Sequence, residues 1–428
     1  MRMKQEQPVS GAATRLAPFP LAIAYVAVPL VAVLSVFMPS TRPVSPVLPW
    51  LLLAGVGVIY AMLFRRSGAR LKKRFFFEVG MFITLVFIVV KNGQDLIHQL
   101  KIFVPVVVEL TPVVMLVFCF LWIITFGLPD RADFQRYGGL LGLLCLIDLA
   151  VEASIYHSAP VTRWIGNIDI LAGLLLLSLC ASLRCGENDG GVYEPDQGRP
   201  VWRFLILLGI AATLSRTGLF AAGWIFLCFG RGSKTIRTVV LLAFLLLIGV
   251  TFLLPTTSSE AVRYVDYWLW AKSLSLFVSD PMLLLTGLPL TKALPLTFPP
   301  GMAGLWEAAT GSLALMGAHL PQVSAFWLRL VLGWGMILPG LCLVVLFVLL
   351  YRRMSRLGAG LFVVLFTLGM VVPLLFDPSL GVATGLAFFL ALSSPAPLPN
   401  VRTASVTDFS SGPAADHDPV VEWDMRPL

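Results

Sequence analysis

Residues Leu205 to Phe229 read LILLGIAATLSRTGLFAAGWIFLCF, an apolar run that one cation, Arg216, interrupts. A guanidinium at the centre of a membrane helix costs about 2.5 to 3.5 kcal/mol on insertion scales, so it seldom stays there without a partner or a task. As one helix, the run 203–229 would be about 40 Å long, which exceeds the ~30 Å of membrane hydrocarbon. As two short helices, it turns around at Ser215 and Arg216. Arg216 is therefore the first candidate site residue of the chain.

The composition is that of a polytopic membrane protein. Of the 428 residues, 58% are hydrophobic and 13% are charged, and the mean hydropathy is +0.88; soluble domains carry about twice that charged fraction. The apolar runs lie at about 18–38, 47–64, 75–91, 103–127, 138–155, 168–184, 203–229, 237–254, 326–350, 359–375 and 380–394. The net charge of +8 indicates basic cytoplasmic loops. No basic and aromatic pattern accompanies it, so no nucleic-acid partner is expected.

The distribution of cations predicts the orientation in the membrane. The loop 65–74 holds six Lys or Arg residues, so we expect it in the cytoplasm, on the same side as the N-terminus. If 203–229 crossed the membrane once, the cations at 231–237 and 352–356 would lie outside. If it crosses twice, both groups lie inside. The sequence therefore predicts about twelve spans, with both termini cytoplasmic and Arg216 at the outer face.

The chain divides into three regions. Residues 1–17 are expected to form a cytoplasmic N-terminus without a cleavage site, 18–394 an all-α polytopic transmembrane domain, and 395–428 a disordered cytoplasmic tail. The segment 255–325, between the ninth and tenth spans, is expected outside as short helices joined by Pro and Gly turns rather than as a separate globular domain. The six cysteines form no CxxC pair, so we expect small core hydrophobes and no disulfide framework.

Candidate polar residues on the outer side gather in this segment. On a helix, Glu260, Arg263 and Asp266 would share one stripe, which Tyr267 and Trp270 extend. Two separated arginines above a membrane suit one task well, the clamping of a diphosphate whose lipid tail stays in the bilayer. Guanidinium groups bind phosphate oxygens in pairs and stay charged. Aromatic faces beside such a clamp would stack on sugar rings.

Each candidate also has a purely structural interpretation. Arg263 can pair with a neighbouring acid on a solvated face, and Arg216 can snorkel to the outer interface. Trp268 and Trp270 can belong to an interfacial aromatic belt. His319, near the return into the membrane, can be an ordinary loop histidine.

Several acids lie in apolar runs, which is the transporter-like feature of the chain: Glu78, Glu109, Asp148, Glu152 and Asp169. Asp148 and Glu152 are one turn apart and would repel each other if both were ionised, so at least one is expected to be protonated or paired. The alternative is that these acids pair with arginines of the bundle. No HExxH, Walker, Ser/His/Asp or DxD-type pattern is present, so we expect chemistry without a metal or a cofactor.

Five short motifs occur together in the order of one bacterial superfamily. They are Thr213–Gly218 (T-x-S-R-x-G), Arg263 with Trp268 and Trp270 (R-x(4-5)-W), Pro281–Gly287 (P-x-x-x-x-G), His319, and Gly333 with Gly335. In these motifs and in its layout, the chain resembles the O-antigen ligase and polymerase superfamily, the Wzy/WaaL-like membrane glycosyltransferases. The resemblance covers roughly residues 140–394. The chain departs from the family at His319, where Leu320 follows in place of the usual Asn.

The resemblance implies an enzyme of the bacterial inner membrane. Arg216 and Arg263 would hold the diphosphate of an undecaprenyl-diphosphate-linked glycan, and His319 would be a general base or would orient the acceptor hydroxyl. Tyr267 and Trp270 would contact the substrate. The acceptor would be lipid A core for a ligase or a growing glycan for a polymerase, and protein O-glycosylation shares the same motifs. From a different class, a transporter or flippase for lipid-linked saccharide is the first alternative, and a binding-only or regulatory membrane protein is the second.

Overall fold

The chain is all-α, as the sequence predicts. The computed structural model describes residues 16–37, 49–50, 108–156, 162–183, 200–230, 233–253, 260–288, 293–299, 301–310, 317–352 and 356–393, with positions 53, 55, 80 and 83. Most of these residues are helical. Within the same ranges, the strands β1 (Thr162–Arg163) and β2 (Gly166–Asn167) pair antiparallel in a small hairpin.

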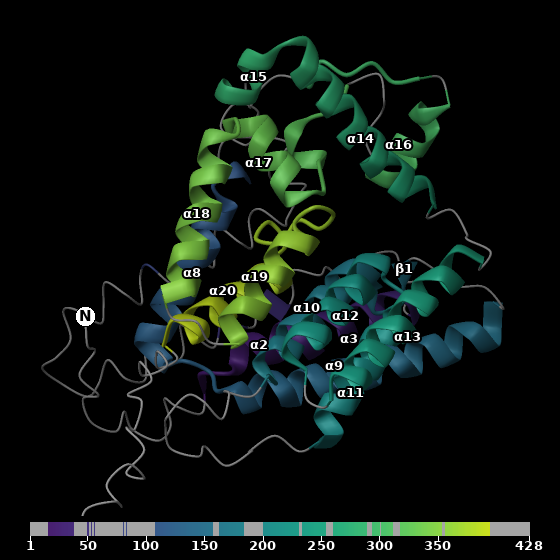
Figure 1. Cartoon of the computed structure of the whole chain (residues 1–428), viewed down its shortest axis with the longest axis vertical. Coiled ribbons are helices and arrows are strands. Elements are labelled where there is room, and N and C mark those ends of the chain that lie inside the picture. The colour runs from purple at the N-terminus through teal and green to yellow at the C-terminus, as the bar shows by residue number, and fades with distance from the viewer. Residues whose placement is uncertain are drawn as a thin grey trace, which may run out of the picture.

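The helices form a lower bundle and an upper cap. The first elements are α2 (Phe19–Ala22), the π-helix η1 (Ile23–Ala27), α3 (Val28–Phe37), α8 (Thr111–Phe126), α9 (Arg131–Tyr156), α10 (Ile168–Ala181), α11 (Pro200–Thr213), α12 (Arg216–Phe229) and α13 (Lys234–Leu253). The others are α14 (Glu260–Ser279), α15 (Pro281–Thr286), α16 (Met302–Thr310), the 3-10 helix η3 (Leu320–Gln322), α17 (Phe326–Trp334), α18 (Ile337–Arg352), α19 (Arg356–Leu368) and α20 (Pro378–Ser393). Figure 1 shows α14, α15 and α16 as the cap above α9 to α13.

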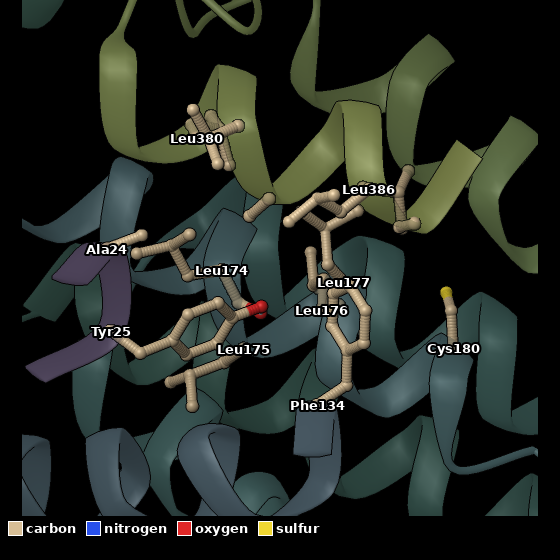
Figure 2. Packing of buried hydrophobic residues seen from close by; sticks show 14 of the residues in the cluster. Ala24, Tyr25, Phe134, Leu174, Leu175, Leu176, Leu177, Cys180, Leu380 and Leu386 are labelled. Atoms are coloured by element: carbon tan, nitrogen blue, oxygen red, sulfur yellow. The ribbon is translucent and has the colours of Figure 1, made fainter. Parts of the chain in front are cut away.

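Helix α10 is the centre of the bundle. Its residues from Leu171 to Ala181 are all buried, and α9, α11, α12, α19 and α20 pack against it. The hydroxyl of Tyr25 donates to the carbonyl oxygen of Leu174 (2.8 Å) and accepts from Ser178 Oγ (3.1 Å). Figure 2 shows the Tyr25 ring beside the leucines of this helix. Because α10 is surrounded by other helices, the residues at its N-terminal end are fixed in position.

Small residues allow α9 and α11 to cross closely. A Cβ atom on Gly142 would lie 2.3 Å from the carbonyl oxygen of Leu205, and one on Gly209 would lie 2.4 Å from the Cα of Gly142. Close backbone contact at small residues is typical of helix pairs that pack within membranes. A larger residue at either glycine would push these two helices apart.

Two described helices have the length and apolar composition to cross a membrane, Arg131–Ser154 and Lys234–Phe252. Eight further apolar helices in the described ranges have between 10 and 17 residues. The expected spans at 47–64 and 75–91 lie almost entirely outside the described residues. The expected number of about twelve spans therefore stays a prediction.

The cap has a hydrophobic cluster of its own. Its first helix, α14, has 20 residues because no Pro or Gly interrupts 260–279, so the prediction of short helices is wrong for this part of the segment. Helices α15 and α16 are short, with six and nine residues. The cluster includes Val265 and Leu269 of α14, Trp306 of α16 and Leu328 of α17. The cap is thus joined to the bundle through α17.

The expected span 326–350 is split in two. Helices α17 and α18 are separated by Gly335, whose φ is 71°. Two backbone hydrogen bonds join the residues at this break to the cap. Leu288 N donates to Leu332 O (2.7 Å), and Met336 N donates to Leu284 O (2.6 Å). The prediction of one helix is wrong here, because an apolar pattern carries no information about hydrogen bonds to a distant segment of the chain.

The cysteines are divided between the core and the surface. Cys119, Cys145 and Cys180 are buried, as predicted, whereas Cys228 and Cys342 are exposed. The prediction of core packing is wrong for these two because the apolar pattern of a helix does not distinguish an outward face from the core. Cys185, the N-terminal residues 1–15, the cationic loop 65–74 and the tail 395–428 lie outside the described residues.

Candidate functional site

The apolar run 203–229 breaks where the sequence predicts. Helix α11 ends at Thr213, and Leu214 has a φ of 54°, in the left-handed region that residues other than Gly rarely adopt. Ser215 is the N-cap of α12, and its Oγ accepts a hydrogen bond from Gly218 N (3.0 Å). Helix α11 packs mainly against α9, and α12 packs mainly against α13. The two halves of the run therefore belong to different helix pairs.

Asp169, in the first turn of α10, holds this turn through both residues that flank Arg216. The Asp169 Oδ1 atom accepts hydrogen bonds from Ser215 Oγ (2.5 Å) and from Thr217 Oγ1 (3.2 Å). Asp169 was noted in the sequence as an acid in an apolar run, but its partnership with the turn was not predicted. One carboxylate oxygen thus fixes the position of the arginine between two hydroxyl residues.

The N-terminal ends of α10 and α12 meet at this point. Asn167 caps α10, because its Oδ1 accepts from Asp169 N (2.8 Å). A Cβ atom on Gly218 would lie only 2.6 Å from the Cβ of Ala172 on α10. The glycine of the T-x-S-R-x-G motif is therefore required for the two helices to approach. Both helix ends carry partial positive charge, which favours the Asp169 carboxylate.

The Arg216 guanidinium reaches the C-terminal end of α13. Its Nε donates to Thr251 Oγ1 (3.0 Å), and its Nη2 donates to the carbonyl oxygen of Thr251 (3.2 Å). Its Cζ lies 3.7 Å from the ring centroid of Phe252, a cation–π contact. Arg216 therefore lies where α13 ends and the chain continues into the segment 255–325.

Asp266 of α14 is bound to the segment that precedes α17. Ser324 Oγ donates a hydrogen bond to Asp266 Oδ1. Burial raises the pKa of Asp266 to about 6; the Ser324 hydrogen bond opposes the rise, and the negative charge of Asp169 adds to it. The Arg216 cluster, defined as Asp169, Ser215, Arg216, Thr217 and Thr251, joins α10, α12 and α13.

The predicted residues of α14 have different surroundings. Arg263 lies in the first turn of the helix, and its side chain is outside the described part of the chain. Trp270 Nε1 donates to the carbonyl oxygen of Met370 (2.9 Å), so this indole ties the cap to the turn after α19. Tyr267 is 74% exposed. The clamp formed by two arginines stays a prediction.

Trp268 packs within the cap. Its ring stacks on Phe298 with centroids 5.0 Å apart, and Phe298 in turn lies 5.0 Å from Trp306. The Trp268 ring therefore packs against the hydrophobic cluster of the cap, and its place in an interfacial belt stays a prediction. Its role is to hold the cap helices together.

His319 lies half-buried at the start of η3. Its backbone N donates to Gln322 Oε1 (2.8 Å), and Gln322 N donates to the carbonyl oxygen of His319 (3.0 Å). The same segment carries Ser324, which contacts Asp266. The segment 317–325 therefore carries both His319 and the hydroxyl that binds the α14 carboxylate.

A buried ion pair contacts the segment 317–325 through Arg329. Arg329 Nη2 lies 2.6 Å from Glu109 Oε1, and the two side chains are 4% and 0% exposed. Arg329 Nη1 also donates to the carbonyl oxygen of Pro321 (3.2 Å), and its Cζ lies 3.7 Å from the ring centroid of Phe376. For Glu109, pairing with an arginine of the bundle is confirmed. Arg329 was missed, although a lone cation in the run 326–350 is the same signal that identified Arg216.

Comparison with protein-family models, with curated proteins and with solved structures gives no match to this chain. The likeness to the ligase and polymerase superfamily therefore rests on the residues of the chain itself. Among the described residues, no group of three or more His, Cys, Asp or Glu is placed to hold a metal ion.

Proposed function

We propose that the protein is a membrane glycosyltransferase of the O-antigen ligase and polymerase type. In this proposal it transfers a saccharide from undecaprenyl diphosphate to an acceptor hydroxyl at the outer face of the bacterial inner membrane. The observation that supports it best is the anchoring of Arg216. The residues on both sides of this arginine are bound to Asp169, at the point where α10 and α12 begin and α13 ends.

An arginine held in this way suits a diphosphate. Guanidinium groups donate paired hydrogen bonds to phosphate oxygens and keep their charge at any physiological pH. During glycosyl transfer, negative charge develops on the departing diphosphate, and a cation already in position stabilises that charge without reorganisation. Arg263 is proposed as the second cation of the clamp. Tyr267 and Trp270 are proposed to contact the glycan, and His319 to orient or deprotonate the acceptor.

The proposal includes about twelve membrane spans with both termini in the cytoplasm. The apolar helices of the bundle support it. The exposed apolar side chains of α13 support it too: Leu242 is 57% exposed, Leu246 is 73% exposed and Phe252 is 65% exposed. Such a face is stable against lipid and would be costly in water. The segment 255–325 would then lie outside with the Arg216 cluster, within reach of a lipid-linked donor.

A transporter or flippase for the same lipid-linked saccharide is the second candidate. Asp148 and Glu152 favour it, because both acids are buried one turn apart on α9, with 5% and 1% exposure. Membrane-buried acids are typical of proton-coupled transport. The two proposals differ in which residues matter: Arg216 for transfer, and Asp148 with Glu152 for transport.

Complementation tests the proposal. Strains that lack an O-antigen ligase or a polymerase would receive the wild type, Arg216→Ala, Arg263→Ala or Arg237→Ala, with the surface glycan analysed on a gel. Arg237 is the matched control, because its Nη1 donates to Leu227 O (3.3 Å) and so links α12 to α13 at the opposite end of this helix pair. We expect the wild type and Arg237→Ala to restore glycan and the other two variants to fail.

Unchanged glycan ladders in both Arg216→Ala and Arg263→Ala would contradict the proposed site. Loss of glycan in Asp148→Asn or Glu152→Gln, with both arginine variants active, would instead support transport. Restoration in the ligase strain alone would identify lipid A core as the acceptor, and restoration in the polymerase strain alone would identify a growing glycan.

A further inference from the structure

The turn that carries His319 is closed by its own hydrogen bonds and is joined to the cap. His319 N donates to Gln322 Oε1 (2.8 Å), and Gln322 N donates to the carbonyl oxygen of His319 (3.0 Å). Leu294, which belongs to the hydrophobic cluster of the cap, donates from its backbone N to Ala318 O (2.7 Å). The turn therefore has a defined shape, and this contact sets its place relative to the cap.

Arg329 holds the same turn from the side of the bundle. Its Nη1 donates to the carbonyl oxygen of Pro321, inside the turn (3.2 Å). Its Nε donates to both carboxylate oxygens of Glu109 (2.9 and 3.1 Å), and its Nη2 donates to Oε1 of the same residue (2.6 Å). The ring centroid of Phe376 lies 3.7 Å from Cζ. One guanidinium thus connects α17, the residues before α8 and the turn of His319.

Stability alone does not explain this ion pair. The side chains of Arg329 and Glu109 are 4% and 0% exposed. Removing two charges from water costs free energy that their attraction does not always repay, and apolar side chains of similar size often stabilise a protein as well or better. What the guanidinium adds is direction, because its planar fork points two nitrogens at the carboxylate and the third at Pro321 O. The pair therefore fixes the position of the turn.

We propose that Glu109 and Arg329 are positioning residues that hold His319 in place for the acceptor. This inference rests on the proposed function, in which His319 orients or deprotonates the acceptor hydroxyl. The donor diphosphate would be held in the bundle by the Arg216 cluster, whereas the turn of His319 contacts the cap. Glu109 precedes α8, which packs against α20 of the bundle. The ion pair thus aligns the acceptor side of the site with the donor side.

A double variant that removes the charges and keeps the packing separates positioning from stability. In Glu109→Met/Arg329→Met, two unbranched apolar side chains replace the pair, so no charge stays buried without its partner. We expect its unfolding temperature to equal or exceed that of the wild type. In lipid nanodiscs, transfer from undecaprenyl-diphosphate-linked O-antigen saccharide to lipid A core, or to a second donor molecule, should be about tenfold to 100-fold slower, because a misplacement of ~1 Å costs up to about 100-fold.

Two further measurements identify the cause of the slower transfer. The affinity for undecaprenyl diphosphate should equal that of the wild type, since the ion pair and the Arg216 cluster share no residue. Acylation of His319 by diethyl pyrocarbonate, followed by mass spectrometry, should be severalfold faster in the double variant, because a turn without its Arg329 contact opens more often. Arg329→Lys keeps a cation opposite Glu109 and should recover part of the transfer rate.

Arg237→Met is the matched control, because Arg237 Nη1 also donates to a backbone carbonyl oxygen, that of Leu227 (3.3 Å). Its transfer rate and its acylation of His319 should equal those of the wild type.

Wild-type transfer and wild-type acylation in the double variant would overturn the inference alone. A lower unfolding temperature, or a loss of undecaprenyl diphosphate affinity that matches the loss of transfer, would overturn it too, because the pair would then have a general structural role. Absence of transfer by the wild type to either acceptor would instead overturn the proposed function, and the acylation of His319 would still show whether the pair holds the turn.

Discussion

At the scale of single residues, Arg216 keeps its charge in an apolar run because protein groups replace the water that it loses. Thr251 supplies a hydroxyl and a carbonyl oxygen, and Phe252 supplies an aromatic face. Asp169 then fixes the turn through the neighbours of the arginine. The position of Arg216 at helix ends also removes most of the cost that it would have at the centre of a span.

Ser215→Ala tests how much the turn depends on this hydroxyl. The substitution removes the N-cap of α12 and a donor to Asp169, so we expect the free energy of unfolding to fall by about 1 to 2 kcal/mol and glycosyl transfer to fall with it. Ser233→Ala is the control, because Ser233 caps α13 at an exposed end by accepting from Ile236 N (3.3 Å). Thermal unfolding and the transfer rate would be measured together. Wild-type transfer by Ser215→Ala would show that the turn is not part of the site.

The sequence predicts the individual residues of the site better than their partners. Arg216 stands out because it is the one cation in its apolar run, and its hydroxyl neighbours mark the turn. The pairing of Asp266 with Ser324, or of Arg329 with Glu109 at a separation of 220 residues, depends on which helices pack together. No local pattern encodes that packing, so these partners become visible only in the folded chain.

At the scale of elements, glycines let the cap and the bundle share backbone hydrogen bonds. The Pro281–Gly287 motif and the Gly333 and Gly335 pair are far apart in the sequence but meet at the break between α17 and α18. A Cβ atom on Gly287 would lie 2.7 Å from Gly333 O, and one on Gly335 would lie 2.1 Å from Leu285 O. The two motifs therefore form one joint, which sets the position of the cap above the bundle.

Gly335→Ala should disrupt this joint. The added Cβ would collide with the backbone of α15, and a φ of 71° strains any residue other than Gly. We expect the free energy of unfolding to fall by about 2 kcal/mol or more, on the scale of such strain and overpacking. Gly340→Ala in α18 is the control, since no atom lies within 4 Å of its Cβ position. Equal unfolding temperatures for the two variants would contradict the joint.

Element boundaries are predicted from the sequence only where local chemistry marks them. The break before α12 is predicted because Ser215 is a good N-cap and Arg216 is costly in a span. The break at Gly335 lies inside the apolar run 326–350, and the groups that hydrogen-bond to it come from the cap. The length and apolar character of this run therefore predict one span, whereas the chain forms two helices.

At the scale of the whole molecule, the proposed orientation places the cap outside and the basic loops inside. The cations at 65–74, 231–237 and 352–356 would all lie in the cytoplasm, in agreement with the preference of Lys and Arg for that side. The cap carries few cations, and it joins the bundle through α17 and through the hydrogen bond of Trp270 to Met370.

Alkaline phosphatase fusions test this orientation, because the enzyme is active only outside the cytoplasm. A fusion after Gly301 in the cap should be active, and one after Gly230, between α12 and α13, should be inactive. Green fluorescent protein at the same two positions should give the opposite pattern. Activity at Gly230 together with none at Gly301 would reverse the orientation and remove the cap from the outer face.

Binding of undecaprenyl diphosphate tests the central claim most directly, that the Arg216 turn holds a lipid-linked diphosphate. Its affinity would be measured for the full-length wild type, Arg216→Ala and Arg237→Ala in lipid nanodiscs. Loss of charge-assisted hydrogen bonds should weaken binding to Arg216→Ala about tenfold or more, and Arg237→Ala should bind as the wild type does. Equal affinity of Arg216→Ala and the wild type would contradict the account.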